Sequence, residues 1–253
     1  MPDRGRRRWS AHVARMASPL DPGPDAQPVH VWSFAVLCAI AGALAVRPHP
    51  VASPVSAVVA LLLGRLGLRV WRWSRLPRLN TAAAHGVVAR YAISLGLGLL
   101  MGLLVLAAIR LVIEPALPAA GVRIAAAAAL PVWRRMAIIY VAAVGEELIF
   151  RLLLLSLVAG LLVRFTRPTD RTPTQGIAWF ANALAAFAFA AIHLPAWTAV
   201  GPLSLGILIM VLTLNGLAGL VCGHIFVRYG IVAAIWTHAG GDCAIQLIGP
   251  LTA

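Results

Sequence analysis

The stretch IIYVAAVGEELIFRLLLLSLVAGLLV (residues 138–163) has the length and composition of a membrane-crossing helix, yet it contains two adjacent glutamates and an arginine. A helix of about 20 apolar residues crosses a hydrocarbon core about 30 Å thick. A charged side chain at the bilayer centre costs about 2.5–3.5 kcal/mol on insertion scales, so such residues usually face the protein interior. The stretch therefore predicts a membrane protein with a polar site inside its helix bundle.

The composition of the whole chain supports the same fold class. Of its 253 residues, 61% are hydrophobic and 11% are charged, and the mean hydropathy is +0.89. Soluble domains are about 45–50% apolar and about 25% charged. We therefore predict an all-α, polytopic helical membrane protein with about seven spans, six or eight being the alternatives. The predicted spans are 30–46, 51–70, 91–113, 132–163, 176–194, 203–227 and 231–249.

The sequence divides into a basic tail, a group of N-terminal spans and a C-terminal part. Residues 1–29 hold five arginines followed by a Pro/Asp/Gly stretch with little apolar content, and they predict a disordered basic tail. A cleaved signal peptide is the alternative, because Ala43-Leu-Ala45 follows an apolar run as a cleavage site would. That run begins at residue 30 and leads into further spans, so we expect it to be a retained helix. Residues 30–131 then form N-terminal membrane spans, and residues 132–253 hold the candidates for chemistry.

The net charge of +13 comes from arginine alone, since the chain has no lysine. Arginines gather in the tail and in the linkers at 69–78 and 164–171. A cytoplasmic N-terminus places all three clusters in the cytoplasm, as the positive-inside rule requires, and leaves Arg134 and Arg135 on the other side. These arginines flank apolar runs, so we predict contact with anionic lipid and no nucleic-acid partner. The arginine-only set and the compact chain favour a multi-pass protein of the bacterial inner (plasma) membrane.

The first polar pattern is Glu146-Glu147-x-x-x-Arg151. On a helix, Glu147 and Arg151 lie one turn apart with the acid N-terminal to the base, the favourable order for an ion pair. Glu146 lies about 100° further around the helix, so one arginine does not satisfy both carboxylates equally. We expect Arg151 to hold one carboxylate and leave the other available as a base. The alternative is an ion pair that only fixes helix packing.

Two further patterns contain histidine. Phe189 and His193 share a helix face at the end of a predicted span, where Pro195 stops the helix. His238 and Asp242 lie one turn apart, so the carboxylate can orient the imidazole or share a bound water with it. Taken singly, each pattern has a structural alternative: a packing histidine in the first case and a helix-stabilising polar pair in the second.

In this order and spacing, E-E-x-x-x-R, F-x-x-x-H and H-x-x-x-D resemble the motifs of the CPBP family. This family comprises the CAAX-processing and bacteriocin-processing intramembrane proteases, also called ABI proteins. The stretch from Cys222 to His238 is also similar to the family's run into its last histidine motif, and the resemblance covers about residues 136–248. It implies a CPBP-like catalytic membrane core within residues 132–253 and hydrolysis of a peptide bond in or near the membrane.

The resemblance also implies roles for the motif residues. Glu146 and His193 would activate a water molecule, and His238 and Asp242 would stabilise the oxyanion of the tetrahedral intermediate. Arg151 would hold the second glutamate and fix the geometry of its helix. The expected partners are the lipid bilayer and a substrate that is a peptide or a membrane protein.

Metal dependence and two other function classes stay open at this point. Glu146, His193 and His238 are candidate ligands for a divalent metal, Zn²⁺ first among them. The helical zinc-protease signature H-E-x-x-H is absent, so both a metallopeptidase and a glutamate-type peptidase are compatible with the sequence. The other classes are a catalytically idle membrane scaffold or immunity protein, against which the intact motifs count, and an ion- or proton-coupled transporter. Two related halves with paired, interrupted helices would favour a transporter, and the sequence shows no such symmetry.

Overall fold

The computed structural model describes residues 29–45, 52–76, 87–167, 169–200 and 202–252. The predicted basic tail, residues 1–29, lies outside this description except for its last residue. The regular secondary structure of the described residues is helical, which confirms the all-α prediction.

The α-helices in chain order are α2 (Val29–Ala45), α3 (Ala52–Ser74), α4 (Val87–Ala108), α5 (Ala119–Ala128), α6 (Val132–Glu147), α7 (Ser156–Thr166), α8 (Gln175–Ala191), α9 (Leu205–Tyr229) and α10 (Ile231–Cys243). Three π-helical segments interrupt or extend them: Ile109–Ile113 after α4, Leu148–Leu155 between α6 and α7, and Ala244–Ile248 after α10. Short 3₁₀ helices cover Leu194–Val200 and Gly249–Thr252.

Within the described residues, five helical stretches are long and apolar enough to cross a membrane: Val88–Ile113, Val132–Thr166, Gln175–Thr198, Leu205–Tyr229 and Ile231–Thr252. They coincide with the last five predicted spans, so the chain is a multi-pass helical membrane protein. Helices α2 and α3 form where the first two spans are predicted, and their crossing of the membrane stays a prediction.

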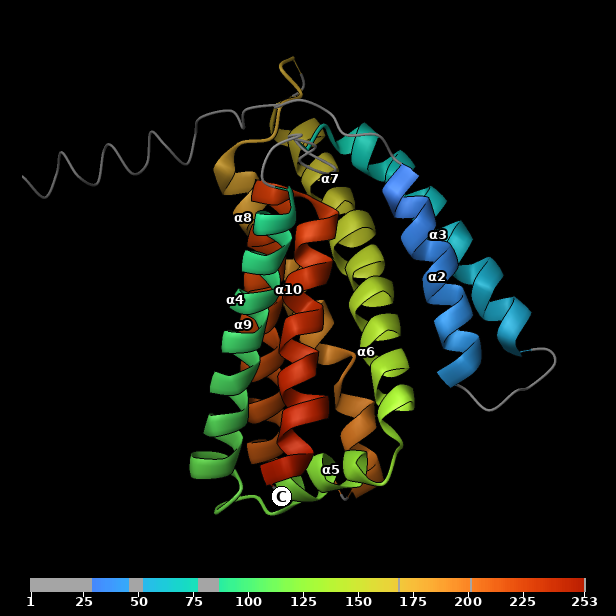
Figure 1. The fold of residues 1–253 in the computed structure, drawn as a ribbon. Coiled ribbons are helices and arrows are strands. Elements are labelled where there is room, and N and C mark those ends of the chain that lie inside the picture. The colour runs from blue at the N-terminus through green and yellow to red at the C-terminus, as the bar shows by residue number, and fades with distance from the viewer. Residues whose placement is uncertain (1–28, 46–51, 77–86, 168, 201, 253) are drawn as a thin grey trace, which may run out of the picture.

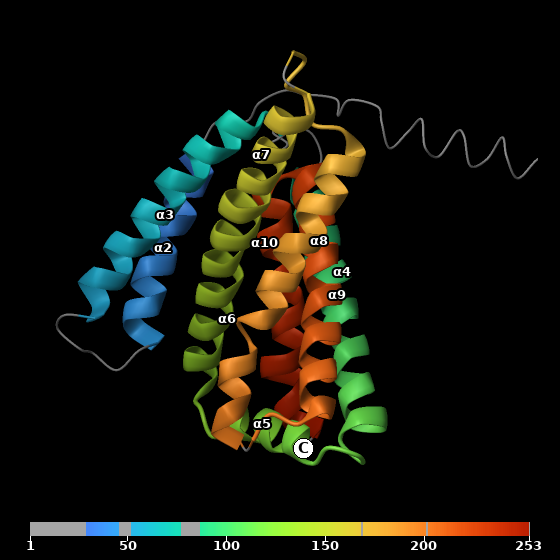
Figure 2. The same ribbon diagram turned by 180° about the vertical axis from the view of Figure 1, so that it is seen from behind.

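The membrane-crossing helices stand side by side as a bundle (Figures 1 and 2). In Figure 1, α10 lies between α4 and α6, and it packs against both and against α9. The α2–α3 hairpin leans on the outside of α6 and α7, and α5 lies across the end of the bundle where α6 begins. The short helix α5 thus forms within the Ala-rich segment that precedes the fourth predicted span.

The two predicted arginine clusters of the linkers meet at one end of the bundle. Arg164, in the last turn of α7, donates a hydrogen bond to the carbonyl of Trp73 (3.0 Å), and its guanidinium lies 3.6 Å from the centre of the Trp73 ring. The ends of α3 and α7 are therefore neighbours, whereas Arg134 and Arg135 follow the start of α6 at the opposite end. This distribution agrees with the asymmetry expected from the sequence.

Local sequence signals explain where the helices begin and end. The hydroxyls of Ser204 and Thr174 accept hydrogen bonds from backbone N–H groups in the first turns of α9 and α8 (3.2 and 3.3 Å). Gly230 has φ 90°, a value that favours glycine, and it separates α9 from α10. Pro195 has no N–H to continue the ladder of α8, which ends at Ala191. The end of α8 determines the position of His193, and the break at Gly230 determines where α10 begins.

Candidate active site

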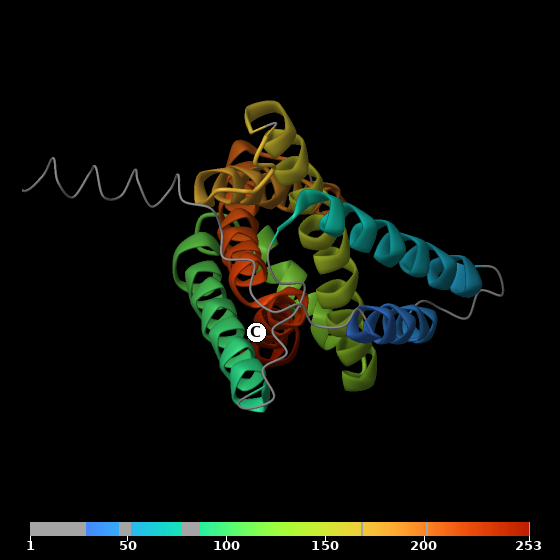
Figure 3. The same ribbon diagram turned by 90° about the horizontal axis from the view of Figure 1, so that it is seen from above.

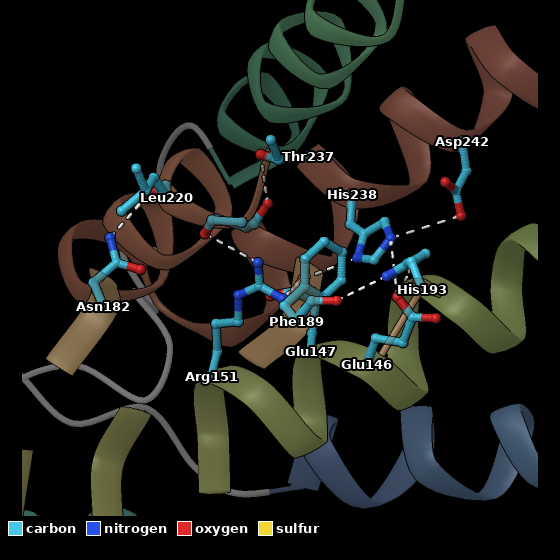
Figure 4. Close-up of polar contacts among 12 residues, drawn as sticks. Glu146, Glu147, Arg151, Asn182, Phe189, His193, Leu220, Thr237, His238 and Asp242 are labelled. Atoms are coloured by element: carbon cyan, nitrogen blue, oxygen red, sulfur yellow. Dashed lines mark hydrogen bonds and ion pairs between the residues drawn. The ribbon is translucent and has the colours of Figure 1, made fainter. Parts of the chain in front are cut away.

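The polar residues singled out from the sequence lie together in the middle of the bundle (Figure 4). They come from α6 with the π-helical segment after it, from the turn that follows α8, and from α10. The residues are Glu146, Glu147, Arg151, His193, His238 and Asp242. Three segments that are distant in sequence therefore converge on one place, as the motifs predict.

Glu147 and Arg151 form the buried ion pair expected from their spacing. Their Oε1 and Nη1 atoms are 2.9 Å apart, and the side chains are 0% and 1% exposed. Arg151 also donates through Nη2 to the backbone carbonyl of Gly219 on α9 (3.0 Å). Glu147 is the last residue of α6, and the π-helical segment begins directly after it, as π-helical turns often do at functional sites. The pair ties this span to α9.

Glu147 has a second partner that the sequence analysis does not identify. Its Oε1 atom lies 2.9 Å from Nδ1 of His238, whereas Oδ2 of Asp242 is 3.7 Å from Nε2 of the same ring. Glu147 therefore orients His238 through Nδ1, a partner additional to Asp242, which lies on the Nε2 side of the ring. The carboxylate accepts the hydrogen bond, so Nδ1 carries the proton and Nε2 is directed toward Glu146 and Asp242.

His193 is held in a similar way by the backbone. Its Nδ1 atom lies 2.8 Å from the carbonyl oxygen of Phe189. A carbonyl only accepts, so Nδ1 is the donor, and Nε2 faces Glu146. Because α8 ends at Ala191, His193 lies in the turn just beyond the helix, and it still contacts Phe189 on the predicted face. Its side chain is 28% exposed, as a residue lining an open cavity would be.

Glu146 points away from Arg151 and toward both histidines. Its Oε2 atom is 3.7 Å from Nε2 of His238 and 3.9 Å from Nε2 of His193. Oε2 is buried and makes no hydrogen bond to any of the described residues. These separations exceed a direct hydrogen bond and leave space for one small ligand that contacts all three side chains. A buried, unpaired carboxylate oxygen is unfavourable in a structure without such a ligand.

The ring of Phe189 fills the space between these groups. The Arg151 guanidinium lies over its face at 4.6 Å from the ring centre. The rings of His193 and His238 lie 4.8 and 5.6 Å from it, and Phe150 meets it edge to face at 5.5 Å. Phe189 thus fixes both imidazoles and the arginine through one apolar contact surface.

A cavity of about 410 Å³ opens beside the cluster. Glu146, His193, His238 and Asp242 line its polar side, and most of the remaining wall is apolar. Asn215 and Gln246 are polar lining residues that the sequence analysis does not single out. Asn215 has no polar residue one turn away, whereas Gln246 follows Asp242 by four residues, a spacing that could have marked it. The cavity can hold water together with an extended, apolar segment of a ligand.

The nitrogen and oxygen atoms of the cluster are of the types that bind a divalent metal, but they lie slightly too far apart. Metal-binding histidines usually donate their second ring nitrogen to a carboxylate or carbonyl, as His238 and His193 do here. Zinc bonds of about 2.0–2.1 Å place tetrahedral ligands about 3.4 Å apart, less than the 3.7 and 3.9 Å from Glu146 to the histidines. Among the described residues, no three His, Cys, Asp or Glu side chains form a ready metal cluster. A metal at this place therefore needs a small inward movement of its ligands.

The fold and the site define a class: a helical membrane protein with a carboxylate–histidine centre facing an internal cavity. Residues 128–244 match the family model described as type II CAAX prenyl endopeptidase Rce1-like. The matched segment contains all six residues of the cluster, and the match confirms the CPBP/CAAX resemblance. No curated protein and no solved structure matches the chain.

Proposed function

We propose that this protein is an intramembrane endopeptidase of the CPBP/CAAX-protease type that hydrolyses a peptide bond with an activated water. One observation carries the proposal. Oε2 of Glu146, which accepts no hydrogen bond from the described residues, lies with Nε2 of both histidines around one small space on the wall of a cavity. A base and two imidazoles around a water-sized space are what peptide hydrolysis requires.

In the proposed reaction, Glu146 and His193 hold the attacking water, and Glu146 accepts its proton as the oxygen adds to the scissile carbonyl. Protonated His238 keeps its Nδ1–H on Glu147 and presents Nε2–H to the oxyanion that forms. Asp242, 3.7 Å from Nε2, favours the proton at that nitrogen. Glu146 then passes its proton to the leaving amine as the carbon–nitrogen bond breaks. A positioned base contributes about 10²–10⁴-fold and an oxyanion donor about 10²–10³-fold.

A divalent metal would replace part of this scheme, because Nε2 of His238 cannot bind a metal and donate a hydrogen bond to the oxyanion at the same time. Glu146, His193 and His238 would hold Zn²⁺, which would polarise the carbonyl and lower the pKa of a bound water. Metal analysis of protein purified in detergent tests this point. We expect about one equivalent of zinc in the wild type and its loss in His193→Ala; a metal-free wild type with full activity in the presence of a chelator would assign the chemistry to the side chains alone.

The arginines support a proposal for the membrane and the orientation. We propose a plasma-membrane protein, in the bacterial inner membrane, whose arginine-rich end faces the cytoplasm together with the N-terminus. The C-terminus then lies outside, since it is at the other end of the bundle (Figure 1). A reporter enzyme active only outside the cytoplasm, fused after the C-terminus, should be active, and an inactive reporter would reverse the orientation.

The proposed activity is tested with purified protein in lipid vesicles that carry a library of membrane-associated peptides. We expect the wild type to cleave one or more peptides and His193→Ala to cleave none. His85→Ala, at a histidine outside the motifs, should leave cleavage unchanged. The scaffold alternative predicts a different result: the wild type cleaves nothing, and any cellular phenotype survives His193→Ala.

A further inference from the structure

Helix α4 lies outside the segment that matches the protease family, yet it makes unusually close contact with α10. A Cβ atom built on Gly98 would fall on the carbonyl oxygen of Thr237, and one on Gly102 would fall on the carbonyl oxygen of Gly241. In the other direction, a Cβ on Gly240 would fall on the carbonyl oxygen of Leu95. The two helices therefore touch backbone to backbone, a contact that only glycine permits.

These contacts lie on either side of the residues that α10 brings to the cavity. Thr237 precedes His238, and Gly240 and Gly241 lie between His238 and Asp242. Seen along the bundle axis, α10 lies between α4 and α6 (Figure 3). The spacing between α4 and α10 therefore sets how far His238 reaches toward the glutamates of α6, now 2.9 Å from Glu147 and 3.7 Å from Glu146.

We propose that Gly98 and Gly102 of α4 are positioning residues for the hydrolytic centre, acting through α10. This inference rests on the proposed function and extends the functional unit beyond residues 128–244 to α4. A methyl group at either glycine would meet backbone atoms, which cannot rotate away, so α4 and α10 must move apart, and any shift of α10 moves His238 relative to α6. Gly102 also lines the cavity, which makes α4 part of the wall of the site. A misplacement of about 1 Å can lower turnover about 10²-fold.

The chain offers a graded set of glycine-to-alanine substitutions. Gly96 is on the same helix, and a Cβ there meets nothing within 4 Å, so Gly96→Ala is the matched control. Gly241→Ala is intermediate, because its Cβ would lie 3.3 Å from Cε of Met101, a flexible side chain that can give way. Gly98→Ala and Gly102→Ala are the severe members. All four changes alter helix propensity by a similar amount of about 1 kcal/mol, so differences among them report on the contact.

The experiment measures kcat and KM for these variants in lipid vesicles, together with thermal unfolding. We expect kcat to fall about 10–100-fold in Gly98→Ala and Gly102→Ala, with KM within about twofold. Gly96→Ala should match the wild type, and Gly241→Ala should fall between them. If the two severe variants unfold at a lower temperature but retain wild-type kcat, the glycines only pack helices and the inference is wrong.

A readout independent of activity separates this inference from the proposed function. In protein labelled with ¹⁵N-histidine, the Nδ1 signal of His238 reports its hydrogen bond to Glu147. We expect that signal to shift in Gly98→Ala and Gly102→Ala, to shift less in Gly241→Ala and to stay in place in Gly96→Ala, even if no peptide is cleaved by the wild type. An unchanged signal in all variants would overturn the positioning role, whereas absent cleavage with a shifted signal would overturn only the proposed function.

Discussion

Glu146→Gln is expected to reduce peptide cleavage by about 10²–10⁴-fold while the protein inserts, folds and purifies as the wild type does. Glutamine keeps the shape of the side chain but cannot accept the proton of a water molecule. Because Oε2 of Glu146 accepts no hydrogen bond from the described residues and the side chain is 24% exposed, we expect folding not to depend on its charge. Initial cleavage rates in lipid vesicles, beside thermal unfolding in detergent, measure both effects.

The matched control for this substitution is Glu114→Gln. Glu114 is also a glutamate near the end of a span, and it pairs with Arg110 at 2.8 Å, away from the cavity. We expect Glu114→Gln to cleave at the wild-type rate. A Glu146→Gln protein that retains wild-type cleavage would remove the proposed base and with it the proposed mechanism.

Arg151→Ala should destabilise the protein by about 3–5 kcal/mol, the largest effect on folding that we expect from a single substitution. The change takes the arginine partner from the fully buried carboxylate of Glu147, leaving His238 as its remaining partner, and it removes the side-chain donor to the carbonyl of Gly219. It also removes the cation over the ring of Phe189. The midpoint of unfolding in a mild detergent, titrated with a denaturing one, measures the loss.

Arg164→Ala is the comparison for Arg151→Ala within the same span. Arg164 lies near the surface, so its loss should cost no more than about 1 kcal/mol. A double variant, Arg151→Met with Glu147→Gln, removes both buried charges and should recover part of the stability lost in Arg151→Ala. If Arg151→Ala unfolds at the wild-type midpoint while Glu146→Gln does not fold, the roles of the two glutamates are reversed.

Hydropathy and short-range spacing account for what the sequence predicts well. The last five spans follow from apolar runs long enough to cross a bilayer, and their helices form where expected. The Glu147–Arg151 pair follows from the four-residue spacing, since residues one turn apart share a helix face. The convergence of Glu146, His193 and His238 follows from the unfavourable burial of polar groups against lipid.

Contacts between distant segments account for what the sequence does not predict. The hydrogen bond from His238 to Glu147 joins residues 91 positions apart, and no periodicity marks it. The place of His193 beyond α8 depends on where Pro195 ends the helix, a boundary that is hard to assign within one or two residues. The close approach of Gly98 to α10 depends on how two helices pack, which a glycine in an apolar run indicates only weakly.

The central claim is that this membrane protein hydrolyses peptide bonds at the cluster around Glu146. The most direct test is mass spectrometry of the membrane-associated peptide library after incubation with wild-type protein in lipid vesicles. The account predicts pairs of fragments whose masses add up to the intact peptide plus one water, and it predicts that Glu146→Gln yields none of them. No fragment pair with the wild type, or the same pairs with Glu146→Gln, would contradict it.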